Sequence, residues 1–221
     1  LSIIVSFEVL FFPNNSFICL THIICIGISL QLSQVVLYPT VVGVDPWAHQ
    51  MITTLIIDSG HIPEGLSYSK LPIFHLLVGI TSFITNLNYK YSSFLAVSSL
   101  QVICNVLFIF LIGKKLFNKK IGLLAAQLVV LANNCIRMGF WVIPNTLGLI
   151  YGVIIMFLLL TMKDRNQMIN SIVIMFLMLI LVQTHPIASM CMAIIFFVSW
   201  LTYHMLCRIK ENGEHISKKL L

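Results

Sequence analysis

A helix N-terminus is predicted at Gly43-Val44-Asp45-Pro46-Trp47-Ala48-His49, directly after a long apolar segment that carries no charged residue. Asp45 is a residue type favoured at the N-cap, and Pro46 is tolerated in the first turn of a helix. On a helix that runs from here to Gly60, His49 lies one turn after Asp45 and shares its face. The apolar residues expected on the opposite face are Ala48, Met51, Ile52, Leu55 and Ile56.

This amphipathic helix is expected to lie in the bilayer interface. Its apolar face suits the acyl-chain boundary, and its polar face carries a carboxylate and an imidazole. We therefore predict that Asp45 faces a water-filled site at the membrane surface. Capping alone explains an aspartate before a proline equally well, and His49 then is only its neighbour on the polar face.

The composition is that of an integral membrane protein. Of the 221 residues, 59% are hydrophobic and 9% are charged, and the mean hydropathy is +1.00. Soluble domains average about 45–50% apolar and about 25% charged residues. Uncharged segments of about 17–25 residues predict membrane-spanning helices. Six such segments are present: 17–38, 93–113, 121–138, 145–162, 168–184 and 187–207.

The net charge of +6 does not indicate a nucleic-acid partner, because the basic residues form short clusters between apolar segments. Membrane orientation explains these clusters better. The cysteines lie inside the predicted spans, without a Cys-x-x-Cys pair or a histidine at metal-ligand spacing, and are interpreted as buried thiols. They are Cys19, Cys25, Cys104, Cys135, Cys191 and Cys207.

Residues 71–87 are ambiguous, because at about 1.5 Å per residue they just reach across a membrane core. If they stay outside as a second interfacial helix, only Lys70, Lys90 and Arg137 of the 13 basic residues fall outside, as the positive-inside rule expects. We therefore predict an all-α polytopic membrane protein with about six transmembrane helices. Its long external loop, 39–92, carries two interfacial helices.

The chain divides accordingly into three parts. These are an N-terminal segment, 1–16, a transmembrane module, 17–207, and a basic cytoplasmic tail, 208–221. The first segment carries Glu8 and lacks the basic leader of a signal peptide.

Residues suited to phosphate and hydroxyl chemistry collect on the predicted outer side. A carboxylate such as Asp45 activates a hydroxyl, with His49 as its neighbour, and an isolated cation such as Lys70 or Arg137 binds an anionic headgroup. Both cations have a structural alternative, because long basic side chains at span ends reach the lipid phosphates.

His185 and Asn145 are further candidates for substrate binding, each at an outer turn beside a proline. The structural alternative for His185 is that it merely ends a helix. The sequence contains no phosphate-binding glycine loop, zinc signature or Ser/His/Asp order.

This arrangement resembles the N-terminal half of the GT-C superfamily of membrane glycosyltransferases. The shared features are a first span, a long external loop that opens with an aspartate, an interfacial helix, a proline-led apolar helix and the basic turn 113–120. Asp45-Pro46-Trp47 with His49 is similar to the Asp-Pro-Trp stretch of oligosaccharyltransferase subunits. The run 68–75, Tyr-Ser-Lys-Leu-Pro-Ile-Phe-His, resembles the Lys-x-Pro-Leu-like stretch of protein mannosyltransferases. The resemblance covers residues 17–207.

The resemblance implies an inverting enzyme that transfers a sugar from a polyprenyl-phosphate-linked donor to an acceptor hydroxyl or amide on the outer membrane face. It implies that Asp45 is the base, the carboxylate that orients the acceptor, or a metal ligand. Lys70 or Arg137 would contact the lipid phosphate on chemical grounds. The implied location is the plasma membrane of a prokaryote rather than the endoplasmic reticulum.

The chain departs from this family pattern in two ways. The place of a second acidic motif reads Ile143-Pro144-Asn145-Thr146 without an acid. One carboxylate is a poor site for a hard divalent cation, which argues against a bound divalent cation without excluding it, and no other cofactor is assigned. The predicted spans are half the family's number, so the chain is expected to be an N-terminal fragment.

A second hypothesis is a non-catalytic membrane subunit or a lipid-binding or transport protein with a membrane protein partner. A transporter would carry charges or broken helices in mid-membrane. The predicted spans contain no Asp, Glu, Lys or Arg in their middle, which argues against transport. The missing second acid favours a non-catalytic subunit.

Overall fold

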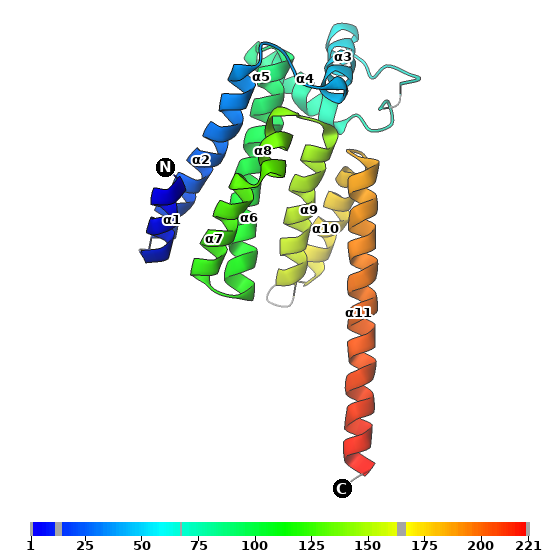
Figure 1. The fold of residues 1–221 in the computed structure, drawn as a ribbon. Helices are drawn as coiled ribbons and strands as arrows, with labels where there is room; N and C mark the ends of the chain where they lie inside the picture. Colours follow the sequence, from blue (N-terminus) through cyan, green and yellow to red (C-terminus); the bar gives the residue numbers. More distant parts are fainter. Residues whose placement is uncertain (1, 12–14, 67, 163–166, 220–221) are drawn as a thin grey trace.

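The computed structural model of the chain is a bundle of helices with a smaller helical layer across one end (Figure 1). It describes residues 2–11, 15–66, 68–162 and 167–219, with only the backbone of 203, 204 and 206–219. No β-strand forms in the described ranges. The predicted all-α class is therefore confirmed.

In the described part of the chain, eight helices form the bundle, and two helical segments join it to the end layer. The bundle comprises α1 (Ser2–Phe11), α2 (Ser16–Leu37), α6 (Ser99–Leu116), α7 (Lys119–Leu131), α8 (Asn133–Phe140), α9 (Pro144–Thr161), α10 (Gln167–Val182) and α11 (Pro186–Lys219). The end layer comprises α3 (Val44–Ser59) and α4 (Ile73–Thr85), and the joining segments are α5 (Tyr89–Ser93) and the π-helical η1 (Phe94–Ser98).

Three described helices are long and apolar enough to cross a membrane. They are α2, the continuous run Tyr89–Leu116 and α9, and the bent pair of α7 and α8 makes a fourth if it counts as one span. The chain is therefore an integral membrane protein by the length and composition of its helices. Of the six predicted spans, the last two correspond to shorter apolar helices, α10 and the segment Pro186–Thr202 of α11.

The predicted span 121–138 is broken in the middle. Ala132 has an extended backbone, and α8 turns by 53° from α7. The Nε2 atom of Gln31 donates to the backbone oxygen of Cys135 and to Oε1 of Gln101, each at 3.2 Å. Because these bonds are buried between helices, Gln31 fixes the broken segment against α2 and α6.

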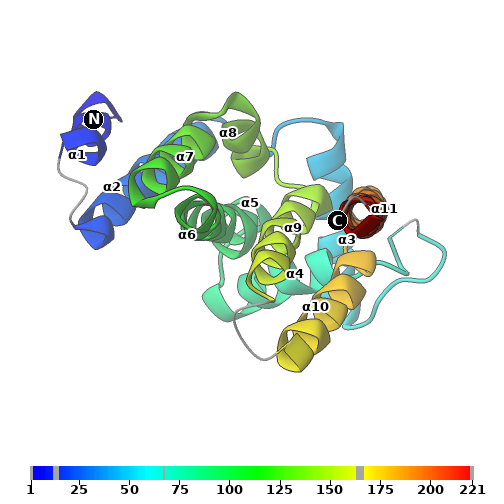
Figure 2. The ribbon, with the colours of Figure 1, turned by 90° about the horizontal axis from the view of Figure 1, so that it is seen from below.

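The core runs along the bundle in three apolar clusters around α6 and α9. The first joins α1, α2, α6 and α7 and includes Val9, Ile23 and Val106. The second joins the end layer to α9 through Phe74 and Ile150, and the third joins α9, α10 and α11. Viewed along the bundle, α6 lies between α7 and α9 (Figure 2).

The end layer differs from the sequence prediction in where α3 begins and which face it buries. The N-cap is Gly43, at φ +93°, and Asp45 lies inside the first turn without capping the helix. His49 is buried on the same face as Ile52 and Ile56 rather than on a wet face. The reason is that α4 packs along this face.

The α4 helix is one of the shorter apolar helices, as are α10 and the first part of α11. Its 13 residues extend about 20 Å at 1.5 Å per residue, whereas the core is about 30 Å thick. The basic turn between α6 and α7 lies at the opposite end of the bundle from α3 (Figure 1). The two ends of the bundle thus differ in charge and in architecture.

Candidate active site

An open cavity of about 440 Å³ lies where α3, the loop before α4, and the first turns of α9 and α11 meet. Cavities of about 300–1,000 Å³ hold small molecules and cofactors. The wall combines apolar side chains with four polar residues. The lining residues are Asp45, Ala48, His49, Met51, Ile52, Leu66, Tyr68, Ile143, Pro144, His185 and Ile187.

Three of the predicted site residues lie together in this cavity, although they are distant in sequence. Asp45 and His49 come from consecutive turns of α3, and His185 precedes α11. A fourth polar residue, Tyr68, was not predicted as a site residue. Its only sequence signal is its place in the run 68–75.

The other three predicted site residues do not line the cavity. Lys70 is exposed in the turn before α4. Arg137 is exposed on α8, with its guanidinium carbon 5.2 Å from the centre of the Trp141 ring. Asn145 is half-buried in the first turn of α9, beside the lining residue Pro144. No lysine or arginine is among the lining residues.

His49 forms a buried pair with His75 of α4. Nδ1 of His49 lies 3.0 Å from Nε2 of His75, and the side chains are 4% and 0% exposed. Burial lowers the pKa of His49 to about 4, opposed by the charge of Asp45 and assisted by His185. Burial, followed by the nearby His49, lowers the pKa of His75 to about 3. Both imidazoles are therefore neutral at pH 7.

Tyr68, in the loop before α4, packs against the rings of both His49 and His75. Its ring meets the ring of His49 edge-on, with a centroid separation of 4.7 Å, and lies 5.5 Å from that of His75. Burial, followed by the charge of Asp45, raises the pKa of the Tyr68 phenol. The phenol is therefore protonated at neutral pH and can donate a hydrogen bond within the cavity.

His185 begins α11 rather than ending a helix. Its Nδ1 atom accepts a hydrogen bond from the backbone N–H of Ala188 at 3.3 Å, as an N-cap side chain does. The side chain is 8% exposed, and burial lowers its pKa. His185 therefore caps the start of α11, which differs from the helix end foreseen for it, and also lines the cavity.

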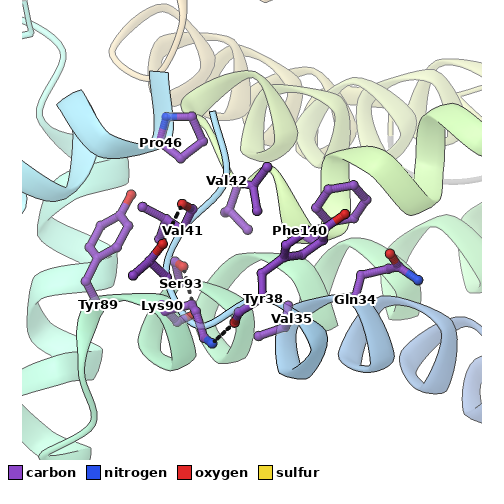
Figure 3. Close-up of a pocket in the computed structure, with 12 residues that line it drawn as sticks. Gln34, Val35, Tyr38, Val41, Val42, Pro46, Tyr89, Lys90, Ser93 and Phe140 are labelled. Carbon is purple, nitrogen blue, oxygen red and sulfur yellow. Dashed lines mark hydrogen bonds between the residues drawn. The ribbon is translucent and has the colours of Figure 1, made fainter. Parts of the chain in front are cut away.

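A second crevice lies beside the loop that leads to α3, and it is too small to hold a ligand. It measures about 10 Å³, room for about one water molecule. Its wall includes Tyr38, Tyr89 and Lys90, and Nζ of Lys90 donates to the backbone oxygen of Tyr38 at 2.7 Å (Figure 3). This contact ties α5 to the end of α2 and so fixes where the loop to α3 begins.

The described side chains contain no group of three or more His, Cys, Asp or Glu residues that could hold a metal ion. Of the cavity-lining residues that the structure describes, Asp45 is the only one with a carboxylate. The chemistry available there is that of one carboxylate, two neutral imidazoles and a phenol.

The comparisons with known proteins give no further assignment. The chain matches no family model, no curated protein and no solved structure.

Proposed function

We propose that the chain is a membrane glycosyltransferase that transfers a sugar from a polyprenyl-phosphate-linked donor, as in the GT-C superfamily that its sequence resembles. The observation that carries the proposal is that Asp45, His49, Tyr68 and His185 line one cavity at the end of an apolar helical bundle. A carboxylate beside neutral hydrogen-bond donors suits the activation of a hydroxyl next to a phosphoryl leaving group.

In the proposed reaction Asp45 is the general base. The acceptor oxygen attacks the anomeric carbon of the sugar and its proton passes to the Asp45 carboxylate. The new bond joins the acceptor oxygen to the anomeric carbon, and the bond from that carbon to the phosphate oxygen breaks. The electron pair leaves with polyprenyl phosphate, and the anomeric configuration inverts.

An apolar groove beside the cavity supports a lipid-linked donor. It measures about 510 Å³ between α3 and α4, and its wall includes Ile56, Ile57, Gly79, Ile80 and Phe83. Ile56 follows the cavity residue Ile52 by one helical turn. The groove would hold the isoprenoid chain while the sugar and phosphate occupy the polar cavity.

The proposal includes the membrane topology expected from the sequence. All six apolar segments cross the membrane, with α10 and the first part of α11 as shorter spans. The layer of α3 and α4 lies in the outer interface, and the basic turns are cytoplasmic. The placement of the α6–α7 turn and α3 at opposite ends of the bundle supports this arrangement.

The second candidate is a non-catalytic lipid-binding subunit. It is favoured by the position of Lys70 and Arg137, because the two cations expected at the lipid phosphate do not line the cavity. Such a subunit would bind a prenyl phosphate without consuming the sugar donor.

The test is sugar transfer by the whole chain reconstituted in liposomes. Polyprenyl-phosphate donors carrying different labelled hexoses or pentoses are supplied with acceptor peptides and lipids, and the release of free polyprenyl phosphate is measured. We expect protein-dependent release from at least one donor. Folded protein that binds a donor but releases no polyprenyl phosphate would contradict transfer and support the subunit.

A further inference from the structure

Among the described residues that line the cavity there is no lysine or arginine, so other groups must bind the phosphoryl oxygens of a donor. The polar lining residues are Asp45, His49, Tyr68 and His185. A carboxylate repels an anion, so the donors must come from the other three residues or from the backbone.

The hydrogen bond to His75 decides which nitrogen of His49 carries the proton. Nδ1 of His75 is fully buried and has no hydrogen-bond partner. A buried N–H without a partner is rarer and more costly than a buried acceptor without one. Nδ1 of His75 is therefore the unprotonated nitrogen, and its Nε2–H donates to Nδ1 of His49. His49 then carries its proton on Nε2.

An independent contact gives His185 the same tautomer. Its Nδ1 accepts the N–H of Ala188, so in the neutral ring the proton is on Nε2. The two imidazoles of the cavity therefore each carry an N–H on the nitrogen that their structural contacts leave free.

These two N–H groups are not used in the structural contacts of the two rings. Neither Nε2 has a hydrogen-bond partner among the described residues, and neither is among the fully buried unpartnered atoms. Both side chains line the cavity although they are more than nine-tenths buried. Two donors without a partner among the described residues thus belong to side chains that line the same cavity, one from α3 and one from the start of α11.

The ends of two long helices add to this polarity. Pro144 in the first turn of α9 and Ile187 in the first turn of α11 both belong to the cavity wall. A helix N-terminus carries about half a positive charge and favours anions. The N-termini of α9 and α11 therefore add partial positive charge on that side of the cavity.

We propose that the cavity binds a phosphate monoester or diester through the neutral Nε2–H groups of His49 and His185, assisted by the N-termini of α9 and α11. This deepens the proposed function, since it names the groups that hold the leaving phosphate. His75 is a positioning residue, because it acts only by fixing the tautomer of His49. The Asp45 carboxylate is left for the acceptor.

The test compares three probes on the whole chain in detergent: geranylgeranyl phosphate, geranylgeraniol and inorganic phosphate. We expect His49→Phe to weaken geranylgeranyl phosphate binding about tenfold or more, as for loss of a hydrogen bond to a charged group, while geranylgeraniol binding is unchanged. If inorganic phosphate competes with geranylgeranyl phosphate in the wild type, the site recognises the phosphate headgroup itself. If inorganic phosphate does not displace geranylgeranyl phosphate, the site is limited to phosphates that are attached to a lipid chain. The matched control is His61→Phe, at an exposed histidine outside the cavity.

His75 variants separate positioning from packing. His75→Gln keeps an N–H for Nδ1 of His49, and we expect binding within about twofold of the wild type. His75→Leu removes that N–H, and we expect binding of geranylgeranyl phosphate to weaken about fivefold or more, in line with one lost hydrogen bond. Equal effects of the two variants would overturn the positioning role.

Nitrogen NMR keeps the proposal testable even where a variant fails to fold. In wild-type protein with ¹⁵N-labelled histidine, we expect His49 and His185 to show the Nε2–H tautomer, with Nε2 shifts that move on adding geranylgeranyl phosphate. An Nδ1–H tautomer at either residue would overturn the proposal. Histidine-dependent phosphate binding without sugar transfer would overturn only the proposed function, and transfer with histidine-independent binding would overturn only this inference.

Discussion

Replacing Asp45 by Asn is expected to lower the rate of sugar transfer by about 100- to 10,000-fold, the usual contribution of a general base. The amide keeps the size of the carboxylate but cannot take the proton from the acceptor. Because the phosphate is assigned to the imidazoles, we expect the KM for the donor to change by less than about threefold, which is less than 1 kcal/mol. The measurement is steady-state release of polyprenyl phosphate from liposomes.

Asp58→Asn is the matched control for this variant. Asp58 is an exposed carboxylate near the end of the same helix, and it does not line the cavity. We expect its transfer rate to equal that of the wild type. An Asp45 variant with full activity would contradict the role given to Asp45, and equal losses in both variants would indicate a general effect of charge on α3.

Gly139→Ala is expected to lower the free energy of unfolding by about 3 kcal/mol, the upper end for overpacking a core. A Cβ atom at Gly139 would lie 2.0 Å from Cδ of Gln31. Gln31 has little freedom to move away, because its Nε2 donates to Gln101 and Cys135. The Gly139 backbone oxygen also accepts from the Ser98 hydroxyl at 2.5 Å. Thermal unfolding in detergent measures the effect.

Gly152→Ala is the control for this substitution. Gly152 lies in α9, another apolar helix, and the nearest atom to its added Cβ would be Sδ of Met192 at an ordinary 3.6 Å. We expect an unfolding midpoint equal to or slightly above that of the wild type, because alanine is the better helix former. Equal stability of the two variants would contradict the close packing of α8 on α2.

The membrane class and most helix positions were predictable because they depend on local composition. A long uncharged apolar segment predicts a helix wherever it packs, and α2 and α9 follow the predicted spans within one or two residues. The break at Ala132 was not predictable in this way. It depends on the approach of Gln31 from another helix, which donates one hydrogen bond to the interrupted segment.

The burial of His49 on α3 was likewise not predictable from the sequence. Asp45 and His49 were predicted on one face of the helix, since residues four apart are neighbours, and both line the cavity. The sequence alone gave no sign that α4 would cover His49 and supply His75 as its partner. That partner comes from a residue 26 positions away, and only the packed structure brings the two rings together.

The site itself was predictable in part. Loops and helix starts carry the polar residues of an apolar chain, so Asp45, His49 and His185 were identifiable one by one. Charge alone suggested Lys70 and Arg137 as phosphate ligands. Both lie outside the cavity, because Lys70 is in an exposed turn and Arg137 packs over Trp141.

The most direct test of the central claim is protection of the cavity by the donor. Ala48→Cys places a thiol on the cavity wall, whereas Thr54→Cys places one on the same helix outside it. The rate of labelling by a charged, membrane-impermeant thiol reagent is measured with and without saturating polyprenyl-phosphate sugar. We predict that the donor slows labelling at position 48 about tenfold and leaves position 54 unchanged. Equal labelling at position 48 with and without bound donor would contradict the assignment of this cavity as the site of transfer.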